Sequence, residues 1–258
     1  MNKKIIYDFG SNNGDDISYY LLKSDLVIAV EANPVLCNHI KKRFKQQILN
    51  GNLIVENCVL NTEVSSGQVN FYIHKTDHVL SQFPKPRNYD EYNEVLLPSK
   101  NVIELIKKYG DPYYIKIDIE NYDEMILREL FINNIMPPYI SSESHSINIF
   151  TSLVALGRYK SFKLVDGSSV SKRYKNYNIN TNNGNVKYSF PHHSAGPFGN
   201  DISGPWMTPE NFFRFLAFAG LGWKDIHASN VENPDPNSVA RAPFKFVRKL
   251  IKNYLRIS

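Results

Sequence analysis

Short apolar runs alternate with amphipathic stretches through the first two-thirds of the chain. The apolar runs at residues 3–9 ("KKIIYDF"), 26–32 ("LVIAVEA") and 52–60 ("NLIVENCVL") predict strands, and the intervening stretches 16–23 and 34–49 predict helices. The same rules predict further strands at 68–74, 112–120, 137–144 and 160–167, and further helices at 99–110, 122–134 and 147–158. Alternation of this kind is typical of an α/β fold with a mostly parallel sheet and helices on both faces.

The pattern stops after residue 167. Residues 168–207 are rich in Ser, Asn, Gly and Pro, which predicts a long excursion too polar for the core. A helix then begins at Pro209, with Thr208 as N-cap and Glu210 in the first turn. We expect one domain, in which residues 1–167 form the core and residues 168–258 supply loops and C-terminal helices.

Composition narrows the class of protein. Hydrophobic residues make up 42% of the 258 residues, which is enough for a sizeable core, and the net charge of +5 gives little reason to expect a nucleic-acid partner. Two cysteines, Cys37 and Cys58, fall in a helical and a strand-like pattern, so we expect buried thiols. The N-terminal stretch is not apolar enough for a signal peptide and no segment approaches the length of a spanning helix, so we expect a cytoplasmic protein.

The C-terminal stretch 244–258 predicts a basic amphipathic helix. We expect it to dock on its own domain; peripheral contact with an anionic membrane and packing on an oligomer partner are the alternatives.

The first predicted strand runs into "YDFGSNNGDD", residues 7–16. Gly10 and Gly14 suit a turn with positive φ against which a ligand can pack, and Glu31 ends the next apolar run, where a carboxylate can accept both hydroxyls of a ribose. The spacing is not G-x-G-x-x-G, and Asp8 is an acid where a pyrophosphate needs donors. A nucleoside-type ligand that carries an amine fits better.

Four segments, "YDFGSNNGDDISYYL", "VIAVEANP", "IVENCVL" and "YYIKIDIENYDEMIL", together resemble the FkbM-like class I methyltransferases over about residues 5–166. The resemblance implies a seven-stranded Rossmann-like sheet, S-adenosylmethionine as cofactor and methylation of hydroxyls, often on sugars. By position it implies that Glu31 binds the ribose and that Asn57 and Cys58 flank the adenine. The rest of the implied cofactor set is Asp8, Gly10, Ser11, Asn12, Asn13, Gly14, Ala32 and Asp118. Asn121 stands where the family usually has a glycine; asparagine also tolerates the left-handed conformation.

Candidate catalytic groups cluster at two predicted strand ends. Asp118 and Glu120 alternate along one strand, and Glu143 and His145 follow the same spacing after another. If these are the fourth and fifth strands, all four border the crevice. We expect His145, supported by Asp118 and Glu143, to take the proton from an acceptor hydroxyl, with His193 as the second candidate. The oxygen and imidazole groups of the four side chains also suit Mg²⁺ or Mn²⁺ as an alternative, but we expect no metal.

The polar excursion offers candidate acceptor contacts. "HHSAGPFG" predicts a loop folded over the site, so His192, His193 and Ser194 are candidate substrate-binding residues, and Trp206 offers a flat surface for a sugar ring. The sequence therefore predicts an S-adenosylmethionine-dependent O-methyltransferase acting on a sugar or glycan intermediate. The alternatives are an inert Rossmann-like binding module in a biosynthetic complex, or a methyltransferase for another small natural product or nucleic acid.

Overall fold

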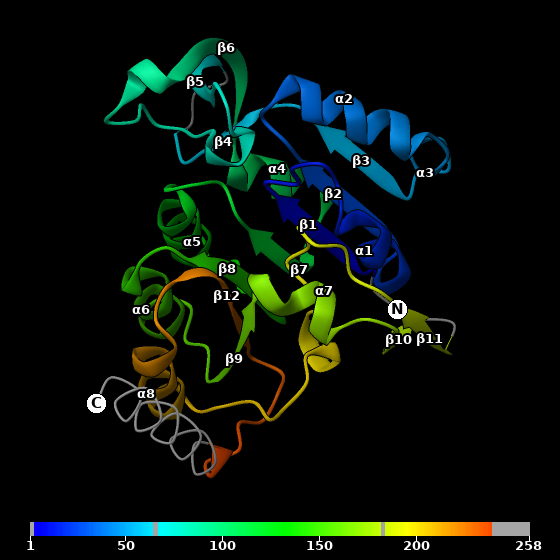
Figure 1. The fold of residues 1–258 in the computed structure, drawn as a ribbon, viewed down its shortest axis with the longest axis vertical. Helices are drawn as coiled ribbons and strands as arrows, with labels where there is room; N and C mark the ends of the chain where they lie inside the picture. The colour runs from blue at the N-terminus through cyan, green and yellow to red at the C-terminus, as the bar shows by residue number, and fades with distance from the viewer. Residues whose placement is uncertain (1–2, 64–66, 182–183, 239–258) are drawn as a thin grey trace, which may run out of the picture.

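A seven-stranded sheet forms the centre of the computed structural model, which describes residues 3–63, 67–181 and 184–238 (Figure 1). Its order is β3-β2-β1-β7-β8-β12-β9, and all neighbouring pairs are parallel except those of β12, which is antiparallel to both β8 and β9. The strands are β1 (Ile5–Phe9), β2 (Leu26–Val30), β3 (Leu53–Glu56), β7 (Pro112–Ile117), β8 (Tyr139–Ser144), β9 (Ser161–Asp166) and β12 (Gly222–Ser229). The expected Rossmann-like α/β fold is confirmed, with β7 and β8 in fourth and fifth place.

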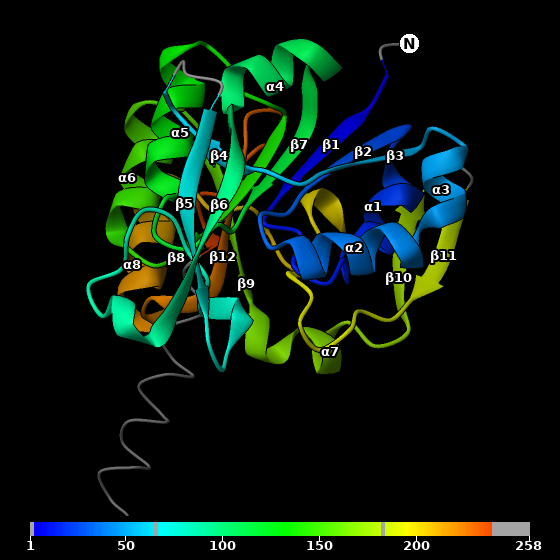
Figure 2. The same ribbon diagram turned by 90° about the horizontal axis from the view of Figure 1, so that it is seen from above.

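Helices cover both faces of this sheet (Figure 2). One face packs on α4 (Val102–Tyr109), α5 (Asp123–Ile132), α6 (Ile147–Ala155) and α8 (Pro209–Ala219). The other packs on α1 (Ile17–Lys23), α2 (Pro34–Arg43) and α7 (Val170–Arg173), and α3 (Lys45–Leu49) follows α2. Thr208 caps α8 as predicted, because its side chain accepts a hydrogen bond from the Asn211 amide.

A second, three-stranded sheet with the order β4-β6-β5 follows β3 in the chain. It contains β4 (Val59–Asn61), β5 (Gly67–His74) and β6 (Tyr92–Asn101), with short 3-10 turns at His78–Leu80 and Tyr89–Glu91. Two expectations are corrected here. The apolar run 52–60 is two strands in two sheets, and residues 68–74 pair with β6 and not with the central sheet. The seventh central strand is instead β12, which the sequence did not predict.

The excursion 168–207 also differs from expectation, because it supplies part of the core. It contains a 3-10 turn at Gly167–Ser169, the hairpin of β10 (Tyr177–Thr181) and β11 (Gly184–Tyr188), and a second 3-10 turn at Gly199–Asp201. Phe190, Phe198 and Trp206 are buried on the α1 face of the sheet. Phe198 stacks on Tyr114 of β7 with ring centroids 4.1 Å apart. Isolated large apolar residues thus anchor a segment that is polar on average.

Two further expectations can be compared with the described residues. Cys37 and Cys58 are both free and buried, as predicted. Within residues 3–63, 67–181 and 184–238, no helix combines the length and apolar character needed to cross a membrane. The basic amphipathic stretch predicted at 244–258 lies outside the described residues.

Candidate active site

A pocket open to solvent lies at the carboxyl ends of β1, β2 and β7. Part of its wall comes from the predicted cofactor set: Gly10, Asn12, Glu31, Ala32, Cys58 and Asp118. The small sheet and its loops contribute apolar side chains, among them Phe71, Val79 and Phe83, and Tyr122 adds a further ring. The pocket therefore has a polar side at the strand ends and an apolar side made by a segment whose role the sequence did not suggest.

The turn after β1 requires glycine for two reasons. Gly10 has a φ of +82°, and a Cβ there would lie 1.7 Å from the Asp118 carbonyl oxygen. The amides of Gly10 and Ser11 both donate to the Val30 carbonyl at 3.0 Å, and Gly14, with a φ of +80°, donates to the Ser11 carbonyl at 2.8 Å. The main chains of β1, β2 and β7 therefore meet closely at one corner of the pocket.

Glu31 ties this turn to the end of β2. Its two carboxylate oxygens accept hydrogen bonds from the Asn12 amide at 2.7 Å and the Asn33 amide at 2.8 Å. Burial raises the pKa of Glu31 to about 7, although both amide hydrogen bonds act to lower it. Glu31 thus lines the pocket and organises its polar corner, and each oxygen keeps a lone pair for a ligand hydroxyl.

Several predicted cofactor residues lie behind the pocket wall. Asn57 donates both of its amide hydrogen bonds, at 2.8 Å, to the carbonyls of Glu31 and Ala32, so it fixes the main chain. The Ser11 hydroxyl donates to the Asp8 carbonyl at 2.9 Å, and the Asn13 side chain bonds Asp15. Cys58 does line the pocket, and burial raises the pKa of its thiol to about 12, which makes it an inert apolar contact.

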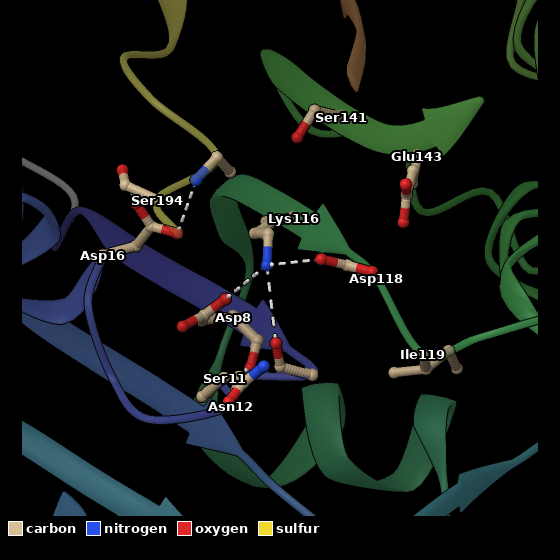
Figure 3. A network of polar contacts seen from close by, with 12 residues as sticks. Asp8, Ser11, Asn12, Asp16, Lys116, Asp118, Ile119, Ser141, Glu143 and Ser194 are labelled. Carbon is tan, nitrogen blue, oxygen red and sulfur yellow. Dashed lines mark hydrogen bonds and ion pairs between the residues drawn. The ribbon is translucent and has the colours of Figure 1, made fainter. Parts of the chain in front are cut away.

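Lys116 is a functional candidate that the sequence reasoning missed. It lies next to the last residue of β7 and is buried, and its Nζ is 3.2 Å from Asp118 Oδ2, 3.8 Å from Asp8 Oδ1 and 3.4 Å from the Gly10 carbonyl oxygen (Figure 3). Burial disfavours the ammonium, but the surrounding carboxylates keep the pKa of Lys116 well above its usual value. The sequence feature that could have identified Lys116 is a lysine inside a predicted strand that is otherwise apolar. Lys116 holds Asp8 and Asp118 in place beneath the pocket.

The predicted catalytic residues meet at the ends of β7 and β8. One potential ligand atom from each of Asp118, Glu120, Glu143 and His145 lies within 4.8 Å of the others. His145 Nε2 is 3.0 Å from Glu143 Oε2 and 3.7 Å from Glu120 Oε2. Asn121 adopts a φ of +63°, which shows how asparagine replaces the usual glycine in the turn. The structure therefore brings together the four side chains that the strand pattern placed at this edge.

The protonation states in this cluster depend on burial and on the close approach of its charged groups. The hydrogen bond to Glu143 raises the pKa of His145 to about 9, despite partial burial. Burial, and then the negative charge of Asp118, raise the pKa of Glu120 to about 8. At neutral pH His145 is therefore mainly an imidazolium and must lose a proton before it can act as a base.

The loop predicted to fold over the site does lie at this edge, but Ser194 is not available to a substrate. Ser194 is buried, its hydroxyl donates to Asp16 Oδ1, and the Ala195 amide donates to Asp16 Oδ2 at 3.0 Å. Ser194 therefore anchors the loop to the start of α1. Its neighbours, His192 and His193, remain exposed, with ring centroids 4.8 Å apart.

The expectation for Trp206 is corrected by its position. Residue 207 pairs with Phe162 near the start of β9, so Trp206 lies at the amino edge of the sheet, away from the pocket. Its indole is buried and bonds Asn200 at 3.3 Å. Trp223, at the start of the antiparallel β12, stands at the carboxyl edge instead. It is 42% exposed, its ring centroid lies 6.0 Å from that of His192, and a Cβ on Gly167 would come within 2.4 Å of its Nε1.

Comparisons with solved structures find relatives of low identity. A methyltransferase FkbM from Methylobacillus flagellatus KT is 13% identical with a TM-score of 0.41; the alignment covers 63% of this chain and 40% of that one. The C-terminal domain of precorrin-6Y C5,15-methyltransferase from Rhodobacter capsulatus is 10% identical with a TM-score of 0.41, covering 89% and 80%. Spermidine synthase from Thermotoga maritima is 10% identical with a TM-score of 0.39, covering 94% and 59%.

No match was found among curated protein sequences. The model of the methyltransferase FkbM domain matches residues 8–164, more than half of the chain and the part that holds the glycine turn, Glu31 and the acidic cluster. The chain belongs to the FkbM family of class I, S-adenosylmethionine-dependent methyltransferases.

Proposed function

We propose that this methyltransferase transfers the methyl group of S-adenosylmethionine to a hydroxyl of a sugar or glycan intermediate. One observation carries the proposal: a single pocket extends from Glu31, at the end of β2, to Asp118 and Glu120, at the end of β7. A nucleoside held at the first end would direct its reactive group toward the acid and histidine cluster at the second.

The residues present fit the cofactor. Glu31 would accept the ribose hydroxyls, the apolar wall at Ala32 and Cys58 would take the adenine, and the turn at Gly10 and Asn12 would contact the amino-acid part. Asp8 is only 1% exposed and lies outside the lining, so it would act through Lys116. The cofactor is a cation at its sulfonium and its amine, and the carboxylates along the pocket supply the complementary charge.

In the reaction the acceptor oxygen attacks the sulfonium methyl group, so an O–C bond forms while the S–C bond breaks and S-adenosylhomocysteine leaves. The hydroxyl proton must pass to a base. His145 remains our candidate, with Glu143 holding its ring at 3.0 Å. Because the pKa of His145 is raised to about 9, the base form becomes more abundant as pH rises toward that value.

The acceptor side favours a carbohydrate. Trp223 exposes an indole beside His192 and His193 at the carboxyl edge, and a flat aromatic surface flanked by hydrogen-bonding rings suits the apolar face and hydroxyls of a sugar. His193 stays the second candidate base. A cytoplasmic location, where sugar intermediates and the cofactor are supplied, is part of the same proposal.

The test uses the purified chain, S-adenosylmethionine labelled in its methyl group, and fractionated glycan precursors. Label should enter a carbohydrate fraction, and the Trp223→Ala variant should lose most of that transfer while it still binds the cofactor. Transfer only to a non-carbohydrate fraction would refute the acceptor class. Cofactor binding without transfer to any fraction would favour the inert binding module.

A further inference from the structure

The cluster at the ends of β7 and β8 has the dimensions of a metal site. Asp118, Glu120, Glu143 and His145 each offer one ligand atom, and these four atoms lie within 4.8 Å of one another. Ligands on opposite sides of a Mg²⁺ or Mn²⁺ ion, each bound at about 2.1 Å, stand roughly 4.2 Å apart, so the four atoms need only small rotations to surround one ion.

Two chain segments aim these donors at a common point. Glu120 and Asn121 both have positive φ, at +49° and +63°, so the chain turns sharply after β7 and brings Glu120 back toward Asp118. Glu143 lies near the end of β8, on the face that also carries Lys116, and Figure 3 shows its carboxylate directed toward the space beside Asp118. His145 Nε2 closes the group at 3.0 Å from Glu143.

Carboxyl groups outnumber basic groups in and beside the cluster. Three carboxylates face the imidazole of His145, and the neighbouring cation, Lys116, is shared with Asp8. Oxygen donors with a single imidazole are the set that hard divalent cations accept, whereas a tetrahedral zinc site draws mainly on Cys and His.

Two buried carboxyl groups next to the cluster provide a second, independent observation that points to a ligand there. Asp225 pairs with Glu143 across the β8–β12 ladder, so both side chains share one face, and it interacts electrostatically with Asp118, Lys116 and Glu143. Its side chain is 3% exposed, and among the described residues Oδ1 has no hydrogen-bond partner. Asp123, 2% exposed at the start of α5, likewise leaves Oδ2 without a partner in that part of the chain. Buried carboxylates are costly unless a cation or donor compensates them.

We propose that Asp118, Glu120, Glu143 and His145 form a binding site for one divalent cation of the Mg²⁺ or Mn²⁺ type. The site stands on these donors alone. Its catalytic use rests on the proposed function: an acceptor hydroxyl on the ion becomes more acidic, so its proton can pass to solvent while His145 serves as a neutral ligand. The cation would then perform the task that His145 has as a base in the metal-free chain.

The test is calorimetric titration of the metal-free full chain with MnCl₂, together with the electron paramagnetic resonance signal of bound Mn²⁺. We expect one Mn²⁺ per chain, competed by Mg²⁺, and affinity at least about tenfold weaker in Glu143→Gln and Glu120→Gln. The matched controls Glu104→Gln and His39→Ala change exposed residues outside the cluster and should bind as the unmodified chain does. Circular dichroism of each variant establishes that it is folded.

Absence of stoichiometric binding, or equal affinity in the folded Glu143→Gln and Glu120→Gln variants, would overturn the site. Cofactor binding measured separately without metal keeps this outcome apart from the proposed function. Mn²⁺ binding with no methyl transfer would support the metal site and reject the proposed function. Unchanged methyl transfer in EDTA, with no Mn²⁺ binding, would support the proposed function and reject the metal site.

Discussion

Replacing Glu31 separates its two tasks, which are to hold the glycine turn and to bind the ribose. Its carboxylate accepts the amides of Asn12 and Asn33 in a buried corner of the pocket. Glu31→Ala leaves both donors without that acceptor, while Glu31→Gln keeps one acceptor oxygen and removes the charge.

The magnitudes follow from two opposed terms. Hydrogen bonds to a charged group contribute about 1.5–3 kcal/mol each, so the two bonds are worth about 3–6 kcal/mol. The desolvation that opposes these bonds is of similar size, because the pKa of Glu31 is raised from 4.5 to about 7 even with both hydrogen bonds in place. The two terms largely cancel, so Glu31→Ala should lower the free energy of unfolding by at most about 3 kcal/mol, and Glu31→Gln should change it by less than about 1 kcal/mol.

Cofactor affinity should respond differently. Loss of both ribose contacts in Glu31→Ala should cost about 2–4 kcal/mol, roughly 30- to 900-fold, and Glu31→Gln should weaken binding at least about tenfold with little loss of stability. Urea unfolding and calorimetric titration with S-adenosylmethionine at pH 8 measure both quantities, with Glu104→Gln as control. A Glu31→Gln variant that binds the cofactor as tightly as the unmodified chain would refute the assignment.

Three further predictions concern the acceptor, pH and the turn. Trp223→Ala should reduce acceptor turnover about tenfold or more with unchanged cofactor affinity, measured by methyl transfer and titration; equal turnover would contradict an aromatic acceptor surface. The pKa in the folded chain is raised to about 7 for Glu31 and to about 9 for His145. Between pH 4.5 and 7 for Glu31, and between pH 6.5 and 9 for His145, the folded chain therefore keeps a proton that the unfolded chain releases, so folding becomes less favourable as pH rises. The melting temperature of the metal-free chain should therefore fall from pH 5 to pH 9, and a rise would reject these pKa values. Gly10→Ala should lower the free energy of unfolding, measured in urea, by at least about 3 kcal/mol, because the added Cβ would lie 1.7 Å from a carbonyl oxygen. The control Gly51→Ala has a φ of +73° and open space around the added Cβ, so it carries backbone strain without a clash and should cost only about 1–2 kcal/mol.

The core strands and the site at their ends could be predicted because parallel strands leave strong, local signals. β1, β2 and β7 are mostly apolar runs, and their carboxyl ends meet at one edge, so the order of Asp8, Glu31 and Asp118 along the chain already placed them together. Glu143 and His145 followed from the same rule. These predictions needed only periodicity and the geometry of a parallel sheet.

β12 and the excursion before α8 could not be predicted in this way because neither has an apolar pattern. β12 buries Asp225 and His227, and burial lowers the pKa of His227 to about 3, so a strand of the central sheet carries polar side chains into the core. The excursion buries Trp206 at the amino edge, and β12 presents Trp223 at the carboxyl edge. Which tryptophan lies at the carboxyl edge depends on the direction of β12, and only tertiary structure sets that.

A polar row across one face of the sheet links these missed features to the site. Asp8, Lys116, Ser141, His227 and Lys163 stand opposite one another on adjacent strands, and all five are buried. Such a row costs stability relative to an apolar face, because each charge must be desolvated. The row lies one step below Asp118, Glu143 and Asp225 on the same face, and its Lys116 is the cation that holds Asp118 at 3.2 Å. One face of the sheet carries this cost directly beneath the carboxyl edge, whereas the opposite face is lined by aliphatic and aromatic residues. The sheet is therefore organised around charge at that edge, where the cationic cofactor and the proton of the acceptor would meet.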